Sequence, residues 1–523
     1  MKILLPAILV LAAAAFVLFM PSASAEDESS VTVGDFQYIL KDGEAIVVNY
    51  EPETVAKDLD IPATITYQDV NYNVVGLKSY CIFESGVETV TIPEFVRTYE
   101  QFSIVASTVT DIFVDPHNAH FMSDDGVLYD FNGSVLLDYP RGKEDPSFSA
   151  RDSTVVIDAY SFIYNSYITS VTLPDSVYCI NDSAFEGCTA LAHVNSYSAD
   201  DSLPSMLMLL GEYAFSECSA LESVKLNEVL NTISSNAFRN TGLHTVSIPD
   251  SIHSISSGAF SSCTNLTAFE STNEDYPVKD GVLYELHNKE LSLLCYPAAR
   301  VGDSFTIPSN VGYVSESAFA DCVNLKEVVL PSGMSVISYF AFDSCKSLER
   351  AVIPDSVVAI EMFAFNDCVN LKDVVLPAKL ASIGQYAFNN VAITSLTIPA
   401  SVSYIGYFAF STCPQLRSVV IEEGELDIDG YAFFGCTALE TIEFFGKDVT
   451  FEDRALMVGA ESSPAEITVI VPKGMSIPDS AAGEFTTLDV KVRGERPYPY
   501  ENFIGVFICI LVLFAIVLAV REV

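Results

Sequence analysis

Basic residues are scarce in this sequence. Of its 523 residues, 26 are lysine or arginine and 69 are aspartate or glutamate, which gives a formal net charge of −43 at pH 7. So acidic a surface repels phosphate groups, and this argues against nucleic acid and anionic lipid headgroups as partners. The simplest interpretation of the acidity is a well-solvated exterior, and cation binding and tolerance to salt would be additional consequences of it.

Local motifs of common catalytic sites are also missing. The chain contains no glycine-rich phosphate loop, no Gly-x-Ser-x-Gly nucleophile turn and no His-Glu-x-x-His zinc motif. Acidic residues are plentiful, but no pair of carboxylates is marked out by its spacing. We therefore predict that the protein is not an enzyme and has no catalytic residues and no cofactor.

Metal-binding patterns are sparse too. No Cys-x-x-Cys pair occurs, which argues against a zinc site of that type. His117 and His120 form the only close histidine pair, and they precede a segment rich in turn residues. Asp427-x-Asp429-Gly430 resembles a fragment of a calcium loop but lacks the later glutamate. We predict no metal site.

The N-terminus has the character of a secretory signal. Lys2 supplies a positive charge, residues 3–20 are an apolar run, and Ser22 to Ala25 supply small residues where a signal peptidase cleaves. We predict a signal peptide at residues 1–25. An uncleaved anchor helix is the alternative, because the apolar run is long.

The C-terminus carries a second apolar segment. Residues 503–520 contain no charge and, as a helix, are long enough to span a hydrocarbon core. Arg521 follows directly, as expected for a cytoplasmic end. The segment predicts one C-terminal transmembrane helix, and hence a single-pass cell-membrane protein with a large extracellular N-terminal portion.

A repeat of 23 residues fills the chain between these ends. In most units, Cys follows an Ala-Phe pair by three residues, Leu follows by three more, and a short alternating run ends in Ile-Pro or Leu-Pro. Alternation predicts a strand, and proline ends it because proline has no N–H for the ladder. One unit cannot bury its apolar residues alone, but stacked units can. The repeated residues are Phe162, Phe185, Phe215, Phe238, Phe260, Phe319, Phe342, Phe365, Phe388, Phe410 and Phe433.

The unit Ala-Phe-x-x-Cys-x-x-Leu-x-x-Val-x-Ile-Pro resembles the BspA-like, Treponema-type leucine-rich repeat, from about Val31 to Phe445. The resemblance implies a leucine-rich-repeat solenoid whose short strands form one curved sheet. With Phe83 as a degenerate first copy, we expect about twelve coils of 23 residues. The resemblance also implies attachment at the cell surface and contact with other cells or hosts.

Two longer intervals interrupt the repeat. Asp125-Gly126-Val127-Leu128-Tyr129 is matched by the same five residue types at 280–284, and a Tyr-Pro pair follows each. We interpret both intervals as inserted β-hairpins, near residues 113–150 and 268–306. The predicted order is a signal peptide at 1–25, an N-terminal β cap at 26–80, repeats at 81–445, a C-terminal cap at 446–492, a stalk at 493–502, the transmembrane helix at 503–520 and a cytoplasmic tail at 521–523.

Twelve cysteines in an exported chain would ordinarily suggest disulfides. Eight of them stand at the same place in the repeat, so their side chains would run parallel, whereas bridged cysteines must face one another. We predict buried free thiols in a small apolar slot. The pairing of Cys81 and Cys179 stays open, and Cys509 lies in the predicted transmembrane helix.

Alternation within the strands also predicts which side chains face outward. In the strand around Val328, that residue points inward, whereas Glu327 and Val329 point outward. Later coils place valines at the same outward position, and contiguous exposed apolar area often marks a contact site. The alternative is that valine simply favours strands. The predicted ligand-binding residues are Glu327, Val329, Arg350, Val352, Asp373, Val375 and Val420.

These observations predict a cell-surface-anchored binding protein, an adhesin or receptor-like molecule. It would recognise an extracellular protein or glycan through the sheet face of the solenoid. A self-associating structural component of the cell envelope or surface coat is the alternative. Sequons at Asn132, Asn181 and Asn265 would be surface features in a host cell that glycosylates them.

Overall fold

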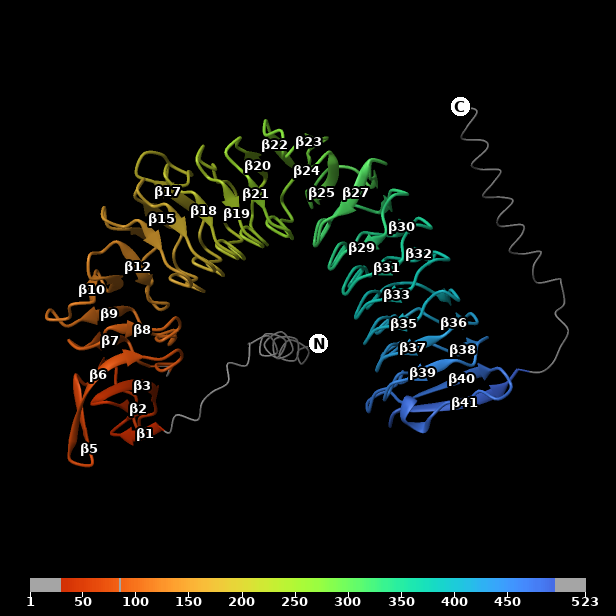
Figure 1. Cartoon of the computed structure of the whole chain (residues 1–523), viewed down its shortest axis with the longest axis horizontal. Coiled ribbons are helices and arrows are strands. Elements are labelled where there is room, and N and C mark those ends of the chain that lie inside the picture. The colour runs from red at the N-terminus through yellow and green to blue at the C-terminus, as the bar shows by residue number, and fades with distance from the viewer. Residues whose placement is uncertain (1–29, 84–85, 494–523) are drawn as a thin grey trace. The chain divides into compact units, whose positions relative to one another are not determined.

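The computed structural model describes residues 30–83 and 86–493 (Figure 1). These residues form short β-strands joined by turns, and their one helix is a 3-10 turn at Asp479–Ala481. They divide into two compact units. The first contains the described residues up to Asp303 together with Asn310–Leu325. The second contains Ser304–Ser309 together with the described residues from Lys326 onward.

Most coils carry two short strands, as the coil that begins with β28 (Glu327–Val329) illustrates. Pro331 ends this strand, and β29 (Val336–Ile337) follows before the turn that contains Phe342. Equivalent strands of successive coils pair in parallel, so Glu327 lies opposite Arg350. Each unit therefore has two lines of strands. We call those before the proline the first ladder and those after it the second ladder.

In the first unit, the first described strands form a mixed sheet of β1 (Ser30–Val33), β2 (Phe36–Lys41), β3 (Glu44–Tyr50), β6 (Val70–Leu77) and β5 (Thr64–Tyr67), with β8 (Thr98–Tyr99) beside β6. In this sheet β6 pairs in parallel with β3 and β8, and the other pairs are antiparallel. The first ladder follows as β4 (Asp58–Asp60), β7 (Thr89–Ile92), β9 (Asp111–Val114), β13 (Ser147–Ser149), β15 (Ser170–Leu173), β17 (His193–Ser196), β20 (Thr245–Ile248) and β22 (Ala268–Ser271). The second ladder contains β12 (Val135–Asp138), β14 (Val156–Ile157), β16 (Cys179–Ile180), β18 (Leu209–Leu210), β19 (Thr232–Ile233) and β21 (Ser254–Ile255).

In the second unit, the first ladder comprises two sheets. One contains β26 (Ser304–Thr306), β28, β30 (Arg350–Val352) and β32 (Asp373–Val374), and the other contains β34 (Ser395–Ile398), β36 (Ser418–Ile421), β38 (Thr441–Phe444), β40 (Ala465–Val471) and β41 (Thr486–Val492). The second ladder contains β29, β31 (Ala359–Ile360), β33 (Ser382–Ile383), β35 (Tyr404–Ile405), β37 (Leu426–Ile428) and β39 (Val449–Phe451).

Antiparallel hairpins lie in the two long intervals of the first unit. The first joins β10 (Phe121–Asp124) and β11 (Val127–Asp130) to β12, which then pairs in parallel with β14. The second joins β23 (Val278–Lys279), β24 (Val282–His287) and β25 (Glu290–Cys295), which pairs in parallel with β27 (Val311–Val314). Each hairpin thus ends in a strand that pairs in parallel with a strand of the next coil.

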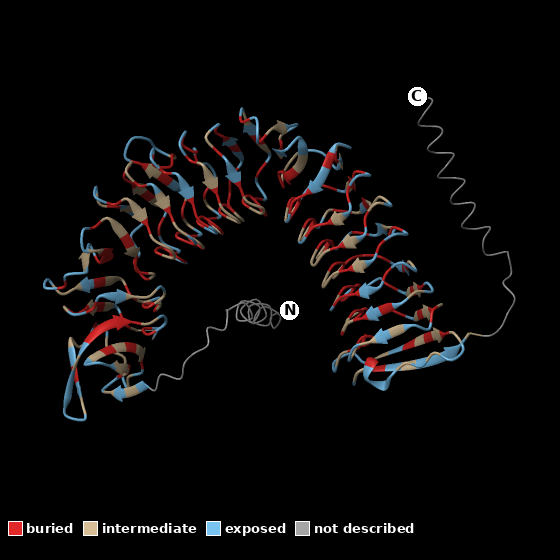
Figure 2. Ribbon diagram, viewed as in Figure 1, coloured by how far each residue is buried: buried red, intermediate tan, exposed pale blue. Residues whose placement is uncertain are grey.

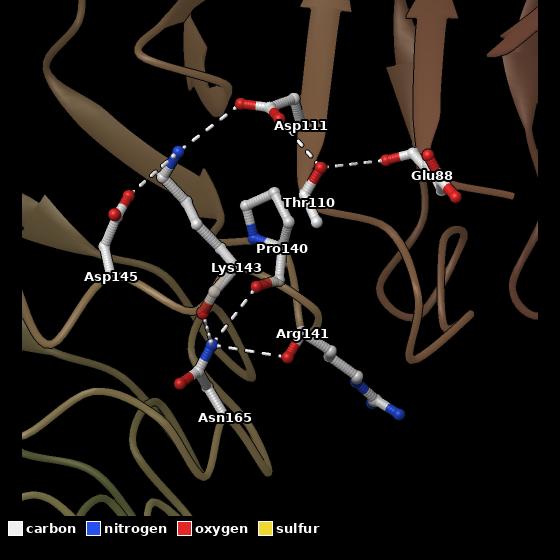
Figure 3. A network of polar contacts seen from close by, with 8 residues as sticks. All are labelled: Glu88, Thr110, Asp111, Pro140, Arg141, Lys143, Asp145 and Asn165. Atoms are coloured by element: carbon white, nitrogen blue, oxygen red, sulfur yellow. Dashed lines mark hydrogen bonds and ion pairs between the residues drawn. The ribbon is translucent and has the colours of Figure 1, made fainter. Parts of the chain in front are cut away.

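The segment after the first hairpin is held by two polar side chains (Figure 3). The Asn165 amide donates hydrogen bonds to the carbonyl oxygens of Pro140 and Lys143, at 3.2 and 3.1 Å. The Lys143 ammonium, whose side chain is 9% exposed, lies 3.4 Å from Asp111 and 3.3 Å from Asp145. These contacts satisfy buried polar groups that a loop between coils would otherwise leave unpaired.

The core of each unit is built from the Ala, Phe, Cys and Leu positions of the repeat, which lie inside the coils (Figure 2). Equivalent phenylalanines stack on one another, with ring centroids 5.1 Å apart for Phe185 and Phe215 and also for Phe342 and Phe365. Such aromatic contacts add about 0.5–1.5 kcal/mol each beyond the burial of their area. The repeat thus stabilises the stack through contacts between coils.

The predicted free thiols are confirmed for the described cysteines, all of which are unbridged and all but Cys179 buried. The repeat thiols donate to the phenylalanine carbonyl of the preceding coil, as Cys188 does to Phe162 and Cys368 to Phe342, both at 3.1 Å. Cys81 and Cys179 are also free.

The prediction of about twelve coils with one curved sheet is wrong. The described chain forms about 18 turns. Strands outside the Ala-Phe repeat, among them β4, β40 and β41, also pair in parallel with ladder strands. The strands form several sheets in two ladders, because the apolar segment after each proline forms a strand of its own.

The predicted transmembrane helix and the single-pass cell-membrane localisation are also wrong for the part of the chain that the structure describes. No helix of residues 30–83 or 86–493 is long and apolar enough to cross a membrane. Apolar residues there alternate with polar ones in short strands and face the coil interior. The segments that motivated the prediction, 1–25 and 503–520, lie outside the described residues, as do the tail and all of the stalk except Arg493.

Candidate ligand-binding surface

Six of the seven predicted residues lie together on one face of the β26–β28–β30–β32 sheet. Glu327, Arg350 and Asp373 stand opposite one another on successive strands. The Arg350 guanidinium lies 3.0 Å from the Glu327 carboxylate, and both side chains are exposed. Strand order thus produces a row of charged residues across three coils.

Beside the charged row lies a row of valines. Val329 stands opposite Val352, and both are half-buried. Val375 directly follows β32 and is 81% exposed. We call these three residues together with the charged row the strand face. Its apolar side chains are accessible next to both a guanidinium and carboxylates.

Val420 does not join the strand face. It lies on β36 of the other sheet, between Thr397 and Glu443. The outward position of that sheet is therefore polar on both sides of Val420, and the apolar row predicted from the sequence is shorter than expected.

An ion pair also borders the strand face. The Lys372 ammonium lies 2.8 Å from the Glu349 carboxylate of the preceding coil, and its hydrogen bond lowers the pKa of Glu349. Both groups are well exposed, and pairs of this kind contribute little to stability. The ammonium and the carboxylate neutralise each other's charge beside the strand face.

Sequence reasoning missed a second line of aromatic residues in the second unit. The residues directly before Ala-Phe stack with ring centroids 4.8–5.1 Å apart, and all five have positive φ. Because the rings stack face to face, they present edges to solvent and strengthen the coil stack. They are Phe340, Phe363, Tyr386, Phe408 and Tyr431. The signal was present, since this position is aromatic in five successive units.

A small pocket at the end of the first hairpin was also missed. The Tyr99 hydroxyl donates a hydrogen bond to the Asp138 carboxylate, and burial raises the pKa of Asp138 to about 7. The Arg141 guanidinium lies 6.0 Å from the Phe102 ring and 5.9 Å from the Tyr164 ring. The sequence marked Asp138 only as the residue before a Tyr-Pro pair, so its half-buried position beside Tyr99 could not be predicted.

Neither surface has the features of a metal centre. In residues 30–83 and 86–493, no group of three or more His, Cys, Asp or Glu side chains is arranged to hold a metal ion. His117 is exposed, and its ring lies 3.0 Å from the Asp115 carboxylate. His120 is exposed as well.

Comparison with known proteins gives one family match. The model described as "BspA type Leucine rich repeat region" matches residues 155–203, 200–293, 301–393 and 335–457. No curated protein sequence matches the chain.

Solved structures also match. A leucine rich cell surface protein from Faecalibacterium prausnitzii A2-165 is 25% identical with a TM-score of 0.48, over 80% of this chain and 96% of that chain. A leucine-rich repeat protein from Eubacterium ventriosum ATCC 27560 is 22% identical with a TM-score of 0.50, over 73% of this chain and 96% of that chain. The second likeness supports the fold.

Proposed function

Because this chain belongs to the BspA type leucine-rich repeat family, we propose that it is a surface binding protein that recognises an extracellular protein or glycan through the strand face. The family consists of repeat proteins, and binding without catalysis suits a scaffold of stacked coils. The observation that carries the proposal is the accessible valine row beside the charged row of Glu327, Arg350 and Asp373.

The two rows would have different roles. The valines supply apolar area that a partner removes from water, at about 25 cal/mol per Å². The Arg350 guanidinium supplies directional donors, which suit carboxylates, carbonyl oxygens or sugar hydroxyls. A few such anchors, rather than total area, set the affinity of an interface.

The test is a capture experiment with extracellular proteins and glycans. The full chain is compared with a strand-face variant in which Val329, Val352 and Val375 are changed to serine. A matched control carries Val358→Ser and Val369→Ser, which alter exposed valines outside the strand face. We expect partners that bind the parent and the control but not the strand-face variant.

Two outcomes would contradict the proposal. If the strand-face variant retains every partner while its unfolding transition is unchanged, binding does not use this face. If the chain captures only itself, it is a self-associating component of the envelope or surface coat, which is the competing function.

A further inference from the structure

One coil of the first unit is longer than its neighbours. Phe185 and Phe215 are separated by 30 residues, whereas Phe215 and Phe238 are separated by 23. The extra residues precede β18, which begins at Leu209, and Met206 and Met208 lie just before it. Leu207 and Leu210 are buried, whereas Met208 and Leu209 between them are exposed.

These outward residues lie beside exposed apolar residues of the neighbouring coils. Cys179, Leu209 and Thr232 stand opposite one another on β16, β18 and β19. This register places Tyr178 beside Met208, and the Met208 N–H donates to the Tyr178 carbonyl oxygen at 3.0 Å. We call the exposed apolar residues of this region the methionine patch: Tyr178, Met206, Met208, Leu209 and Val229.

The methionine patch is exposed and local. Met206 is 58% exposed, and Tyr178 and Met208 are each 48% exposed. The next coils carry Asn231 and His253 at the position of Met208, so the surface becomes polar beyond the patch. Methionine side chains are flexible and polarisable, and they adapt to apolar partners of varied shape.

Carboxylates border the methionine patch on two sides. Asp182 and Glu212 follow β16 and β18, and the Glu212 N–H donates to the Asp182 carboxylate at 2.7 Å. On the other side, Met206 donates its N–H to the carbonyl oxygen of Asp175, and Glu228 precedes Val229. The patch therefore offers apolar contacts within an acidic border.

Basic residues of these coils lie elsewhere. From Asp152 to Asp250 the sequence has twelve acidic residues and two basic ones. The backbone of Lys225 forms an isolated parallel β-bridge with that of Ser202. The Arg239 guanidinium lies 3.5 Å from the Glu217 carboxylate. The acidic border of the methionine patch is therefore not neutralised by lysine or arginine from its own coils.

We propose that the methionine patch binds a cationic amphipathic segment of a partner protein. Its apolar side chains would cover Met206, Met208 and Leu209, and its lysines or arginines would pair with the bordering carboxylates. An anionic lipid surface would be repelled by the same carboxylates. A second copy of this chain would bring further negative charge. The site lies in the first unit and is separate from the strand face, so the two proposals fail or succeed independently.

The test uses the full chain and three synthetic peptides that form helices. One, the lysine–leucine peptide, places leucine at helical spacing (i, i+3, i+4, i+7) along one face and lysine on the other, a second replaces leucine by serine, and a third replaces lysine by glutamate. We expect the lysine–leucine peptide to bind at least about tenfold more tightly than either control. Equal binding of the lysine–serine peptide would show only attraction to an acidic surface and would overturn the proposal.

Variants locate the site. Met206→Ser with Met208→Ser should weaken binding of the lysine–leucine peptide by about tenfold or more, whereas Val358→Ser in the second unit should leave it unchanged. Glu212→Gln with Glu228→Gln should weaken it most at low salt. Unaltered affinity in the methionine variant, with an unchanged unfolding transition, would disprove the assignment.

Cys179 provides a second readout within the native chain. It is half-buried and stands opposite Leu209, so a bound segment would cover its thiol. The lysine–leucine peptide should slow alkylation of Cys179, and the lysine–serine peptide should not. Unchanged alkylation at a saturating concentration of the lysine–leucine peptide would place its binding elsewhere and overturn the proposal.

Discussion

The rings of Phe340 and Phe363 stack with centroids 4.8 Å apart and planes 9° apart, and both residues have positive φ, at 55° and 58°. A bulky residue in this conformation costs roughly 1–2 kcal/mol, because its Cβ approaches the following carbonyl oxygen. Stacking offsets the cost, since Phe363 also contacts Tyr386 at 4.9 Å.

Because ring stacking stabilises Phe363 while its positive φ destabilises it, glycine should be more stable than alanine at this position, the reverse of the usual order. Phe363→Ala should destabilise the chain by about 1–3 kcal/mol, because both ring contacts are lost while the unfavourable backbone conformation remains. Phe363→Gly should be more stable than the alanine variant by about 1 kcal/mol, because glycine adopts positive φ freely. Urea unfolding of the two variants measures the difference.

Ser418 supplies the matched control for Phe363. It lies in strand β36, where glycine should be less stable than alanine. If the alanine variant is more stable than the glycine variant at both positions, the positive φ of Phe363 does not affect the free energy of unfolding. The contribution of Phe363 would then come from its ring alone.

Thiol reactivity should differ sharply along the chain. Burial raises the pKa of Cys81 to about 12 and also raises the pKa values of Cys188 and Cys368, so little thiolate forms near neutral pH. Cys179 is only half-buried. We expect iodoacetamide to modify Cys179 first in the native chain, as measured by peptide mass spectrometry.

Labelling in urea is the control for this difference. The buried thiols should then react at rates similar to that of Cys179, because burial no longer protects them. Rapid native labelling of Cys188 or Cys368 would show that their coils open readily, which the packed core does not predict.

The sequence was most informative within the repeat, because the same residue types recur at the same positions of successive coils. Phe342, Cys345 and Leu348 are buried because each coil must present the same side chains to its neighbours, and a fixed period reveals this directly. The number of turns could not be obtained in this way. Strands such as β40 and β41 join the ladder through backbone pairing, and backbone hydrogen bonds leave little trace in residue types.

The candidate surface shows the same limit. Alternation along one strand predicts an outward Val375, and this residue is indeed highly exposed. Whether successive strands stay paired depends on coil geometry, and Val420 lies on a sheet separate from that of Val375. The aromatic line before Ala-Phe escaped prediction because its residues have positive φ, which neither strand nor helix periodicity describes.

Asp138 should make stability depend on pH. Its pKa of about 7 in the folded chain lies above its usual value of about 3.9, so the folded chain binds the proton more tightly than the unfolded chain does. Its contribution is complete below about pH 4 and is lost as the pH rises through about 7. An amide at this position has no such titration, so Asp138→Asn removes the dependence.

The measurement is the free energy of unfolding of the parent minus that of Asp138→Asn, taken across this range. We expect this difference to fall between about pH 4 and pH 7 and to be constant above it. A difference that rises with pH would mean that Asp138 is stabilised as a carboxylate, with Arg141 outweighing the effect of burial.

Lys143 should stabilise the segment after the first hairpin more than an exposed lysine could. Its buried ammonium lies between Asp111 and Asp145, so Lys143→Met would leave two carboxylates without their partner. Since these carboxylates are partly exposed, we expect a loss of about 1–2 kcal/mol in the free energy of unfolding. Hydrogen exchange of residues 140–145 should also accelerate, because the segment is held to β9 through this side chain.

Lys372→Met is the matched control for Lys143, because its ion pair with Glu349 also joins two coils but is exposed. We expect its effect to remain within about 0.5 kcal/mol and to shrink further at high salt. The effect of Lys143→Met should persist at high salt, since the buried ammonium is poorly screened. Equal effects of the two substitutions would show that the Lys143 contacts are ordinary surface ion pairs, and that Asn165 and the backbone alone hold the segment in place.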